Sequence, residues 1–243
     1  MKRNSRLVLA AALAALSLAH SARADEAAVK KGIEAWLGGS GAPKVESVRK
    51  FGALGLYEVQ VDGELVYTDA KVSHVILGDV IDVKARRNLT EERKQKLSQI
   101  KFSDLPLDLA VKQVKGNGKR VVATFEDPNC TYCRKLAKEL QGVNDVTIYT
   151  FLYPILSPDS ADKSKNIWCA TDRAKAWNDL MVEGKTPASA NCDHPTEKVV
   201  AVGRKLNIRG TPTMFFADGS RVPGYMPVAM LEKALDKGSA NIR

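Results

Sequence analysis

Residues 121–133 read Val-Val-Ala-Thr-Phe-Glu-Asp-Pro-Asn-Cys-Thr-Tyr-Cys, and this stretch decides the fold of the C-terminal part of the chain. The run Arg120–Phe125 is mostly apolar and includes three β-branched residues, which predicts a buried strand. A polar loop over Glu126–Asn129 follows, and the residues Arg134–Leu140 have helical spacing. The pattern therefore places a Cys-x-x-Cys pair at the junction between a strand and the next helix.

The position of the two cysteines suggests that they are reactive. At a helix start the unpaired backbone N–H groups and the helix dipole favour an anion, and such sites lower a thiol pKa from about 8.5 to roughly 3.5–7.5. We therefore predict that Cys130 is the nucleophile. Cys133 follows one turn later on the same side of the helix, so we expect it to act as the resolving thiol.

Two other interpretations of the motif are weaker. A zinc site needs a second close pair of ligands, but Cys169 and Cys192 are far apart in the sequence and the three histidines have no ligand spacing. We expect no metal. A purely structural disulfide between the first two cysteines would close a tight loop, which adds little chain-entropy stabilisation.

The rest of the C-terminal part alternates between strand and helix patterns. Val146–Phe151 and Thr213–Phe216 are predicted strands with a helical insert between them, and Pro227–Lys237 is a predicted helix that stops at Gly238. This order predicts a central sheet flanked by helices.

Cys169 and Cys192 bracket the helical insert. A disulfide between them would be a permanent structural cross-link. Closing a loop of that size stabilises the folded state by roughly 3 kcal/mol in the chain-entropy model. The alternative is a second redox pair that passes electrons to the first, which nothing in the local sequence supports.

The sequence Gly-Thr-Pro-Thr at 210–213 precedes the last of these strands. A proline at a strand start favours an edge position or a cis bond. Together with the upstream cysteine pair, this order resembles the thioredoxin arrangement, in which a Thr-cisPro dipeptide packs beside the reactive thiols. The resemblance implies that Thr211 and Pro212 bind an extended substrate segment.

The first 24 residues have the pattern of a signal peptide. Lys2, Arg3 and Arg6 form a positive head, Leu7–Ala19 is apolar, and Ala-Arg-Ala at 22–24 is a small-x-small cleavage site. The alternative of a membrane anchor is weaker, because the apolar run is shorter than the about 20 residues that span a bilayer. We expect export, with a mature chain that starts at Asp25.

Charge gives little evidence for a nucleic-acid partner. The predicted signal peptide holds four of the 37 basic residues and none of the 28 acidic ones, so its removal lowers the net charge from +9 to +5. The remaining basic residues are interspersed with acidic ones and not clustered, which is typical of a solvated surface. We therefore expect no binding to nucleic acid.

The N-terminal block predicts a small α+β module. Glu26–Leu37 has nearly helical spacing and stops at a glycine-rich turn. Short strand-like runs follow at 45–48, 56–61, 65–68 and 74–77, with a hairpin signal at Asp62-Gly63. The hairpins leave strand edges that must be covered or paired, which favours an edge-to-edge dimer.

A mostly polar helix is predicted from Asn88 to about Ile100, with Thr90 as its N-cap and Glu91 and Glu92 in its first turn. A polar helix after a β-rich module is typical of a solvated connection between two domains.

The chain resembles a known family, the periplasmic disulfide isomerases DsbC and DsbG, and it resembles DsbC more closely. The motifs that carry the resemblance are Gly-Glu-Leu-Val-Tyr-Thr-Asp at 63–69, Asp-Pro-Asn-Cys-Thr-Tyr-Cys at 127–133, Ile-Trp-Cys-Ala at 167–170, Gly-Thr-Pro-Thr at 210–213 and Val-Pro-Gly-Tyr at 222–225. The Trp-Cys pair with its partner Cys192 favours DsbC, because DsbG-like proteins generally lack that second disulfide.

The resemblance implies a signal peptide at 1–24, a cystatin-like dimerisation domain at 25–85, a linker helix at 86–106 and a thioredoxin-like catalytic domain with a helical insertion at 107–243. It also implies a V-shaped homodimer in the periplasm, no cofactor, and reduction by a membrane thiol reductase of DsbD type.

The active-site dipeptide Thr131-Tyr132 departs from the family pattern, because DsbC proteins usually have Gly-Tyr there. This dipeptide helps to set the thiol pKa and the reduction potential. The position six before Cys130 is Thr124, where thioredoxin and the oxidase DsbA have a buried carboxylate. Glu126 is the nearest candidate for a proton relay, but we expect it to be a solvated loop carboxylate.

The favoured function is the reduction and isomerisation of incorrect disulfides in misoxidised or unfolded exported proteins. One alternative is a dithiol oxidase of DsbA type, which would rest in the oxidised state and would not obviously need a dimerisation module. The other is a holdase chaperone that binds unfolded chains in an apolar cleft without chemistry.

Overall fold

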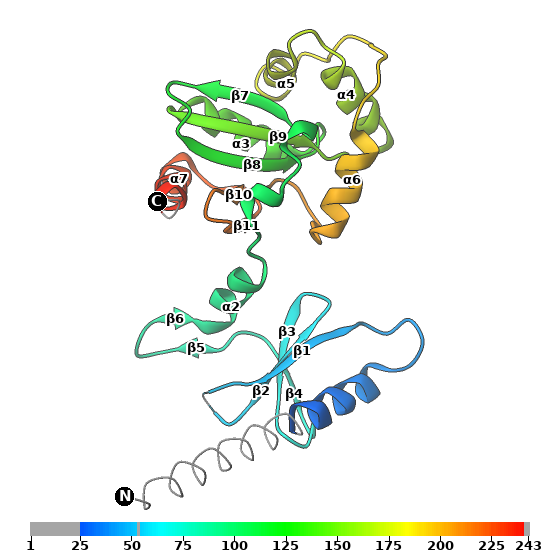
Figure 1. The fold of residues 1–243 in the computed structure, drawn as a ribbon, viewed down its shortest axis with the longest axis vertical. Coiled ribbons are helices and arrows are strands. Elements are labelled where there is room, and N and C mark those ends of the chain that lie inside the picture. The colour runs from blue at the N-terminus through cyan, green and yellow to red at the C-terminus, as the bar shows by residue number, and fades with distance from the viewer. Residues whose placement is uncertain (1–24, 53, 241–243) are drawn as a thin grey trace, which may run out of the picture. The chain divides into compact units, whose positions relative to one another are not determined.

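The computed structural model describes residues 25–52 and 54–240, and the chain divides into two compact units between Lys94 and Gln95 (Figure 1). Both units combine helices with a sheet, so the predicted α+β fold class is confirmed. The signal peptide predicted at 1–24 lies outside the described residues. Within the described ranges, no helix is long and apolar enough to cross a membrane.

The N-terminal unit consists of a helix over residues 25–37 and an antiparallel sheet in the order β1-β2-β3-β4. The strands are β1 (Val45–Lys50), β2 (Tyr57–Val61), β3 (Glu64–Thr68) and β4 (Val75–Leu77). The helix buries Val29 and Ile33 in the same cluster as Val59 of β2. Asp62 and Gly63 both have positive φ, 47° and 83°, which confirms the predicted two-residue hairpin between β2 and β3.

A short hairpin of β5 (Ile81–Asp82) and β6 (Arg87–Asn88) leads into α2 (Leu89–Leu97). The predicted cap of this helix was wrong, because the Asn88 Oδ1 accepts the N–H of Glu91 at 2.9 Å and so caps it. Thr90 is buried instead, and its hydroxyl lies 2.6 Å from the Tyr67 hydroxyl. The domain boundaries at 85 and 106 stay predictions.

Glu58 of β2 is a buried carboxylate that ties α2 to the N-terminal sheet. Its side chain accepts hydrogen bonds from Arg49 of β1 at 2.6 Å and from Arg93 of α2 at 2.9 Å. Burial alone would raise the pKa of Glu58, but the bonds from the two guanidinium groups hold it below its usual value.

The C-terminal unit is built on a five-stranded sheet in the order β11-β10-β8-β9-β7. Its strands are β7 (Val111–Lys115), β8 (Arg120–Glu126), β9 (Val146–Leu152), β10 (Thr213–Phe216) and β11 (Arg221–Pro223). Strands β8 and β9 are parallel, and the other pairs are antiparallel. Strand β8 lies at the centre of the sheet, and the next helix begins shortly after its carboxyl end.

Among its described residues, five α-helices and two short 3₁₀ helices complete this unit. They are η1 (Phe102–Asp104), η2 (Leu107–Leu109), α3 (Thr131–Gln141), α4 (Pro158–Trp168), α5 (Arg173–Met181), α6 (Thr196–Lys205) and α7 (Val228–Ala240). Leu136 of α3 and Leu231 of α7 pack with Val122 on one face of the sheet. Val199 of α6 packs with Phe125 on the other face, and helices α4 to α6 form the insertion between β9 and β10 (Figure 1).

Helix α6 approaches the sheet closely at Gly203. A Cβ atom there would lie 2.3 Å from the ring of Tyr153, whose hydroxyl donates to the Ile208 carbonyl at 3.0 Å. Glycine is therefore required for this contact.

Candidate active site

The two free thiols of the described chain lie at the start of α3. Cys130 is the N-cap residue of α3, and its Sγ accepts the N–H of Cys133 at 3.3 Å. The N–H of Cys130 donates to the Asp127 carbonyl at 3.0 Å, which fixes the backbone of the loop before the helix. An N-cap sulfur that faces free N–H groups is an acceptor site that favours a thiolate.

The surroundings of Cys130 lower its pKa from 9.0 to about 6. The largest cause is the hydrogen bond from the Cys133 thiol, and burial opposes it. The backbone N–H groups of Cys133 and Tyr132 also stabilise the thiolate. At neutral pH most of the Cys130 population is therefore charged.

Cys133 has the opposite character. It is fully buried, whereas Cys130 retains 5% of its surface exposed. Burial raises the pKa of Cys133. Its hydrogen bond to Cys130 raises this pKa further, and so does the electrostatic effect of the nearby Glu126. The two cysteines thus form an asymmetric pair, with one thiolate and one thiol.

Glu126 corrects an expectation from the sequence, since it is not a solvated loop residue. Strand β8 continues to Glu126, which pairs with Leu152 of β9. Its side chain is completely buried on the same face of the strand as Val122 and Thr124. The Thr124 hydroxyl donates to Oε1 at 2.7 Å, and Oε2 has no hydrogen-bond partner within the described residues.

The burial of Glu126 changes its protonation. Desolvation raises its pKa from 4.5 to about 8; the bond from Thr124 opposes this rise, and the charge of Cys130 adds to it. The carboxyl group therefore titrates at about pH 8. It lies near the thiol of Cys133, which must lose its proton to react.

The loop before β10 lies against the nucleophile. The Cys130 Sγ is 3.3 Å from the Thr211 carbonyl oxygen, and the Thr211–Pro212 peptide bond is cis. The Thr211 hydroxyl is buried and has no hydrogen-bond partner in the described part of the chain. Thr211 and Pro212 thus come together with the cysteine pair, although 81 residues separate Thr211 from Cys130.

Asp127, to which the sequence pattern assigned no role, is a buried carboxylate that organises the reactive loop. It accepts the backbone N–H groups of Asn129 at 2.8 Å, Ile155 at 2.7 Å and Leu156 at 2.9 Å, and the hydroxyl of Ser160 at 2.8 Å. The signal in the sequence was the Asp-Pro-Asn turn, because an aspartate there caps nearby N–H groups. Its other partners are about 30 residues away and could not be inferred.

The two residues between the cysteines are exposed at the start of α3. Thr131 is the first residue of the helix. Tyr132 is 56% exposed, and its ring lies 6.4 Å from that of Tyr225 and 5.0 Å from the Lys135 ammonium. Within the described ranges, no group of three acidic, histidine or cysteine residues is arranged to hold a metal ion.

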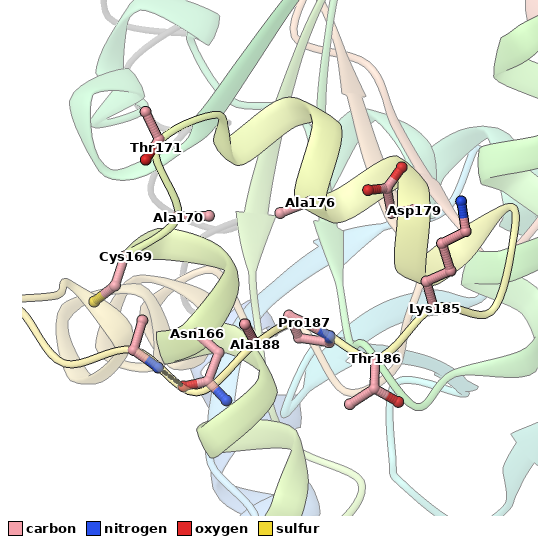
Figure 2. A pocket seen from close by; sticks show the side chains of 11 residues that line it. Asn166, Cys169, Ala170, Thr171, Ala176, Asp179, Lys185, Thr186, Pro187 and Ala188 are labelled. Atoms are coloured by element: carbon pink, nitrogen blue, oxygen red, sulfur yellow. Dashed lines mark hydrogen bonds between the residues drawn. The ribbon is translucent and has the colours of Figure 1, made fainter.

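Cys169 and Cys192 form a disulfide in the helical insertion. Cys169 caps the end of α4, and the neighbouring Asn166 accepts the N–H of Ala190 at 3.1 Å (Figure 2). A hollow of about 470 Å³ lies between α4, α5 and the segment 185–190. Its walls are mostly alanine, threonine and proline, and neither Cys130 nor Cys133 lines it.

The cysteine pair opens the helix that follows the central strand, so the C-terminal unit is a thioredoxin-like domain with a free dithiol. A family model described as a thioredoxin-like domain matches residues 107–239. A second model, described as the N-terminal domain of disulfide bond isomerase proteins, matches residues 20–91. The chain belongs to the DsbC family of thiol:disulfide interchange proteins, which confirms the resemblance seen in the sequence.

Individual relatives agree with this assignment. The thiol:disulfide interchange protein DsbC of Escherichia coli is 30% identical over 220 residues, which cover 89% of each chain. The probable DsbC of Bordetella parapertussis is 55% identical over 181 residues, and the chain spans 65% of that protein's length. A crystal structure of a disulfide interchange protein from Neisseria gonorrhoeae matches 56% of this chain and 99% of its own, with 43% identity and a TM-score of 0.54.

Proposed function

We propose that this chain is an enzyme that reduces and isomerises incorrect disulfide bonds in exported proteins. The observation that carries the proposal is the asymmetry of the dithiol. Cys130 has a pKa of about 6 and reaches the surface, whereas Cys133 is fully buried with a raised pKa. Such a pair provides one thiolate that attacks the substrate and one thiol that can later resolve the mixed disulfide.

Isomerisation uses Cys130 alone. Its thiolate attacks one sulfur of a wrong disulfide, forms a mixed disulfide, and releases the other substrate sulfur as a thiolate. The released thiolate attacks another disulfide of the same substrate. A substrate thiolate finally attacks the mixed disulfide and expels Cys130 as a thiolate, so that no electrons are gained or lost overall.

Reduction adds a second step when no substrate thiolate resolves the mixed disulfide. Cys133 loses its proton and attacks the Cys130 sulfur, which forms the Cys130–Cys133 disulfide and releases the substrate as a thiolate. Glu126 is the buried carboxyl group suited to accept that proton. A mixed disulfide removes the charge of Cys130, which contributes to the raised pKa of Glu126, so the carboxyl ionises more readily at that stage.

The oxidised enzyme must be reduced again, and we assign this step to a membrane thiol reductase of DsbD type in the periplasm. Thr211 and Pro212 would hold the extended substrate segment beside Cys130. The enzyme would be a homodimer. Support comes from the match to the isomerase N-terminal domain and from the edge strand β4, where Ile76 and Leu77 are 48% and 72% exposed.

The proposal is tested by refolding a scrambled multi-disulfide protein with the reduced full-length enzyme. Cys130→Ala should abolish the recovery of native substrate, whereas Cys133→Ala should retain a part of it and accumulate mixed disulfides. Equal recovery with wild type and Cys130→Ala would contradict the proposal. Suppression of aggregation by Cys130→Ala should remain, since it needs no thiol chemistry.

Thiol trapping of the protein as isolated from cells separates the isomerase from a dithiol oxidase. Cys130 and Cys133 should be reduced, and Cys169 and Cys192 oxidised. Finding all four cysteines oxidised would favour the oxidase.

A further inference from the structure

The mixed disulfide can end in two ways, and only one of them needs a base. A substrate thiolate that attacks the substrate sulfur restores a disulfide in the substrate and releases Cys130 as a thiolate, without any proton transfer. Resolution by Cys133 starts instead from a completely buried thiol, which attacks only after it has lost its proton. A group that accepts this proton therefore speeds reduction and does not act on isomerisation.

Glu126 is placed to act on the second route. Its pairing partner Leu152 packs in one cluster with Cys130 and Cys133, and the side chain of Glu126 is completely buried on the same face of the sheet. The Thr124 hydroxyl donates to Oε1 at 2.7 Å, whereas Oε2 has no partner among the described residues. A buried carboxyl oxygen without a partner is costly, so this oxygen is open to a proton from a neighbouring donor.

The residue after Glu126 stabilises the sulfur that loses the proton. The backbone of Asp127 hydrogen-bonds to the Cys133 sulfur and lowers its pKa, against the effects of burial and of Glu126. This backbone is held in place, because the Asp127 carbonyl accepts the N–H of Cys130 at 3.0 Å and the carboxylate accepts four further bonds. Two consecutive residues thus provide an acceptor for the proton and a fixed donor for the thiolate.

The charged groups around Glu126 are few in the described part of the chain. At the start of α3, the two cysteines interact with it electrostatically. The Asp127 carboxylate is directed to donors that include those of the segment 155–160, and α7 places Glu232 and Asp236 beside Arg120 at the opposite end of β8. The neighbouring strands present uncharged side chains on the Glu126 face, namely Ile148, Thr150 and Leu152 from β9 and Met214 and Phe216 from β10.

We propose that Glu126 decides whether each mixed disulfide ends in reduction or in isomerisation. The ionised carboxyl takes the proton of Cys133, whose thiolate then attacks the Cys130 sulfur; the Cys130–Cys133 disulfide forms, and the substrate leaves as a thiolate, reduced by two electrons. With the carboxyl protonated, Cys133 keeps its proton, and the mixed disulfide lasts until a substrate thiolate expels Cys130. The inference rests on the proposed function and adds the regulation of its product.

The same proton returns in the next step. When the thiol reductase attacks Cys130 of the oxidised enzyme, Cys133 leaves as a thiolate and takes the proton back from Glu126. The carboxyl is therefore ready for the next mixed disulfide.

The proposed control depends on pH in a definite direction. The pKa of Glu126 is about 8 in the reduced enzyme, and the charge of Cys130 contributes to this value. The mixed disulfide removes that charge, so the carboxyl ionises at a lower pH at that stage. Isomerisation should therefore prevail at lower pH, and reduction should increase as the pH rises toward 8.

The first measurement isolates the release of substrate by Cys133. Reduced full-length enzyme in excess is mixed with two short peptides joined by a disulfide, so that the peptide that leaves is too dilute to attack back. Acid quenching and mass spectrometry follow the loss of the mixed disulfide. Glu126→Gln should slow this loss on the order of 100-fold at pH 8, the lower end of what a positioned base contributes. Glu139→Gln is the matched control on α3 and should release the peptide at the wild-type rate.

A second variant shifts the control without removing the carboxyl. The bond from Thr124 lowers the pKa of Glu126, so Thr124→Val should move the rise of peptide release to higher pH. A purely structural effect would lower the release rate at every pH and leave the midpoint of the profile unchanged.

The second measurement follows a scrambled disulfide protein from pH 6 to 8. With wild type, the ratio of reduced to native product should rise with pH, whereas Glu126→Gln should keep this ratio low and still yield native product. Peptide release by Glu126→Gln at the wild-type rate, or identical pH profiles for the two enzymes, would overturn the proposal. A wild type that never isomerises, but whose peptide release depends on Glu126, would contradict the proposed function and support Glu126 as the acceptor of the Cys133 proton.

Discussion

The hydrogen bond from the Cys133 thiol to Cys130 gives the sharpest test of the electrostatics. This bond is the largest cause of the low pKa of Cys130. Cys133→Ala removes the donor, so the pKa of Cys130 should rise from about 6 toward 9.0. The backbone N–H at position 133 still donates to Cys130, so the rise should be incomplete.

The size of the effect on reactivity follows from the thiolate fraction. With a pKa of about 6, about nine tenths of Cys130 is charged at pH 7. A rise of one unit lowers that fraction to about one half, and a rise of two units lowers it to about one tenth. Reactivity at pH 7 is therefore a sensitive readout of this single bond.

The assay is the pH dependence of alkylation at position 130, followed by mass spectrometry. Cys133→Ser is the matched control, because its hydroxyl can still donate to the thiolate and should hold the midpoint lower than alanine does. An alanine variant with a midpoint still near pH 6, or equal shifts with serine and alanine, would refute this role of the Cys133 thiol.

Three further predictions concern stability, measured by chemical denaturation. Glu126 has a folded pKa of about 8 against 4.5 unfolded, so the folded protein keeps a proton that the unfolded chain loses, and stability falls as pH rises through this window. Glu126→Gln should therefore gain stability over wild type from about pH 4.5 to 8; a pH-independent difference would contradict this. Gly203→Ala should lower the free energy of unfolding by about 1–3 kcal/mol, because the new methyl group would clash with the Tyr153 ring. An unchanged free energy of unfolding would contradict this close contact. Glu58→Gln should destabilise the N-terminal unit by about 1–3 kcal/mol at pH 7. Because the folded pKa of Glu58 lies below 4.5, the loss should be constant above about pH 4.5 and should shrink as the pH falls below that value; a loss that did not change with pH would contradict this.

The sequence was sufficient for features that depend on local pattern. The strand, loop and helix around Cys130 follow from a β-branched run and a change to helical spacing. The Asp62-Gly63 hairpin follows from the positive φ that its turn requires. Strand β7 was missed because Lys112, Gln113 and Lys115 make it polar, and its pairing with β9 supplies the stability that its composition does not.

Features that depend on distant partners could not be predicted. Thr90 fits a helix cap by residue type, but the hydroxyl of Tyr67 binds it in the interior. Glu126 follows an apolar run and resembles a loop residue, yet pairing with β9 extends the strand by one position and buries it. The role of Asp127 rests on Ile155, Leu156 and Ser160, whose proximity only the fold determines.

In the proposed reaction, Cys130 is the residue that forms the bond to the substrate. The most direct measurement is to mix reduced Cys133→Ala enzyme with a scrambled disulfide protein, quench with acid, and map the mixed disulfide by mass spectrometry. We expect substrate attached to Cys130, with Cys169 and Cys192 still bonded to each other. Substrate attached to Cys169 or Cys192, or no mixed disulfide at all, would contradict it.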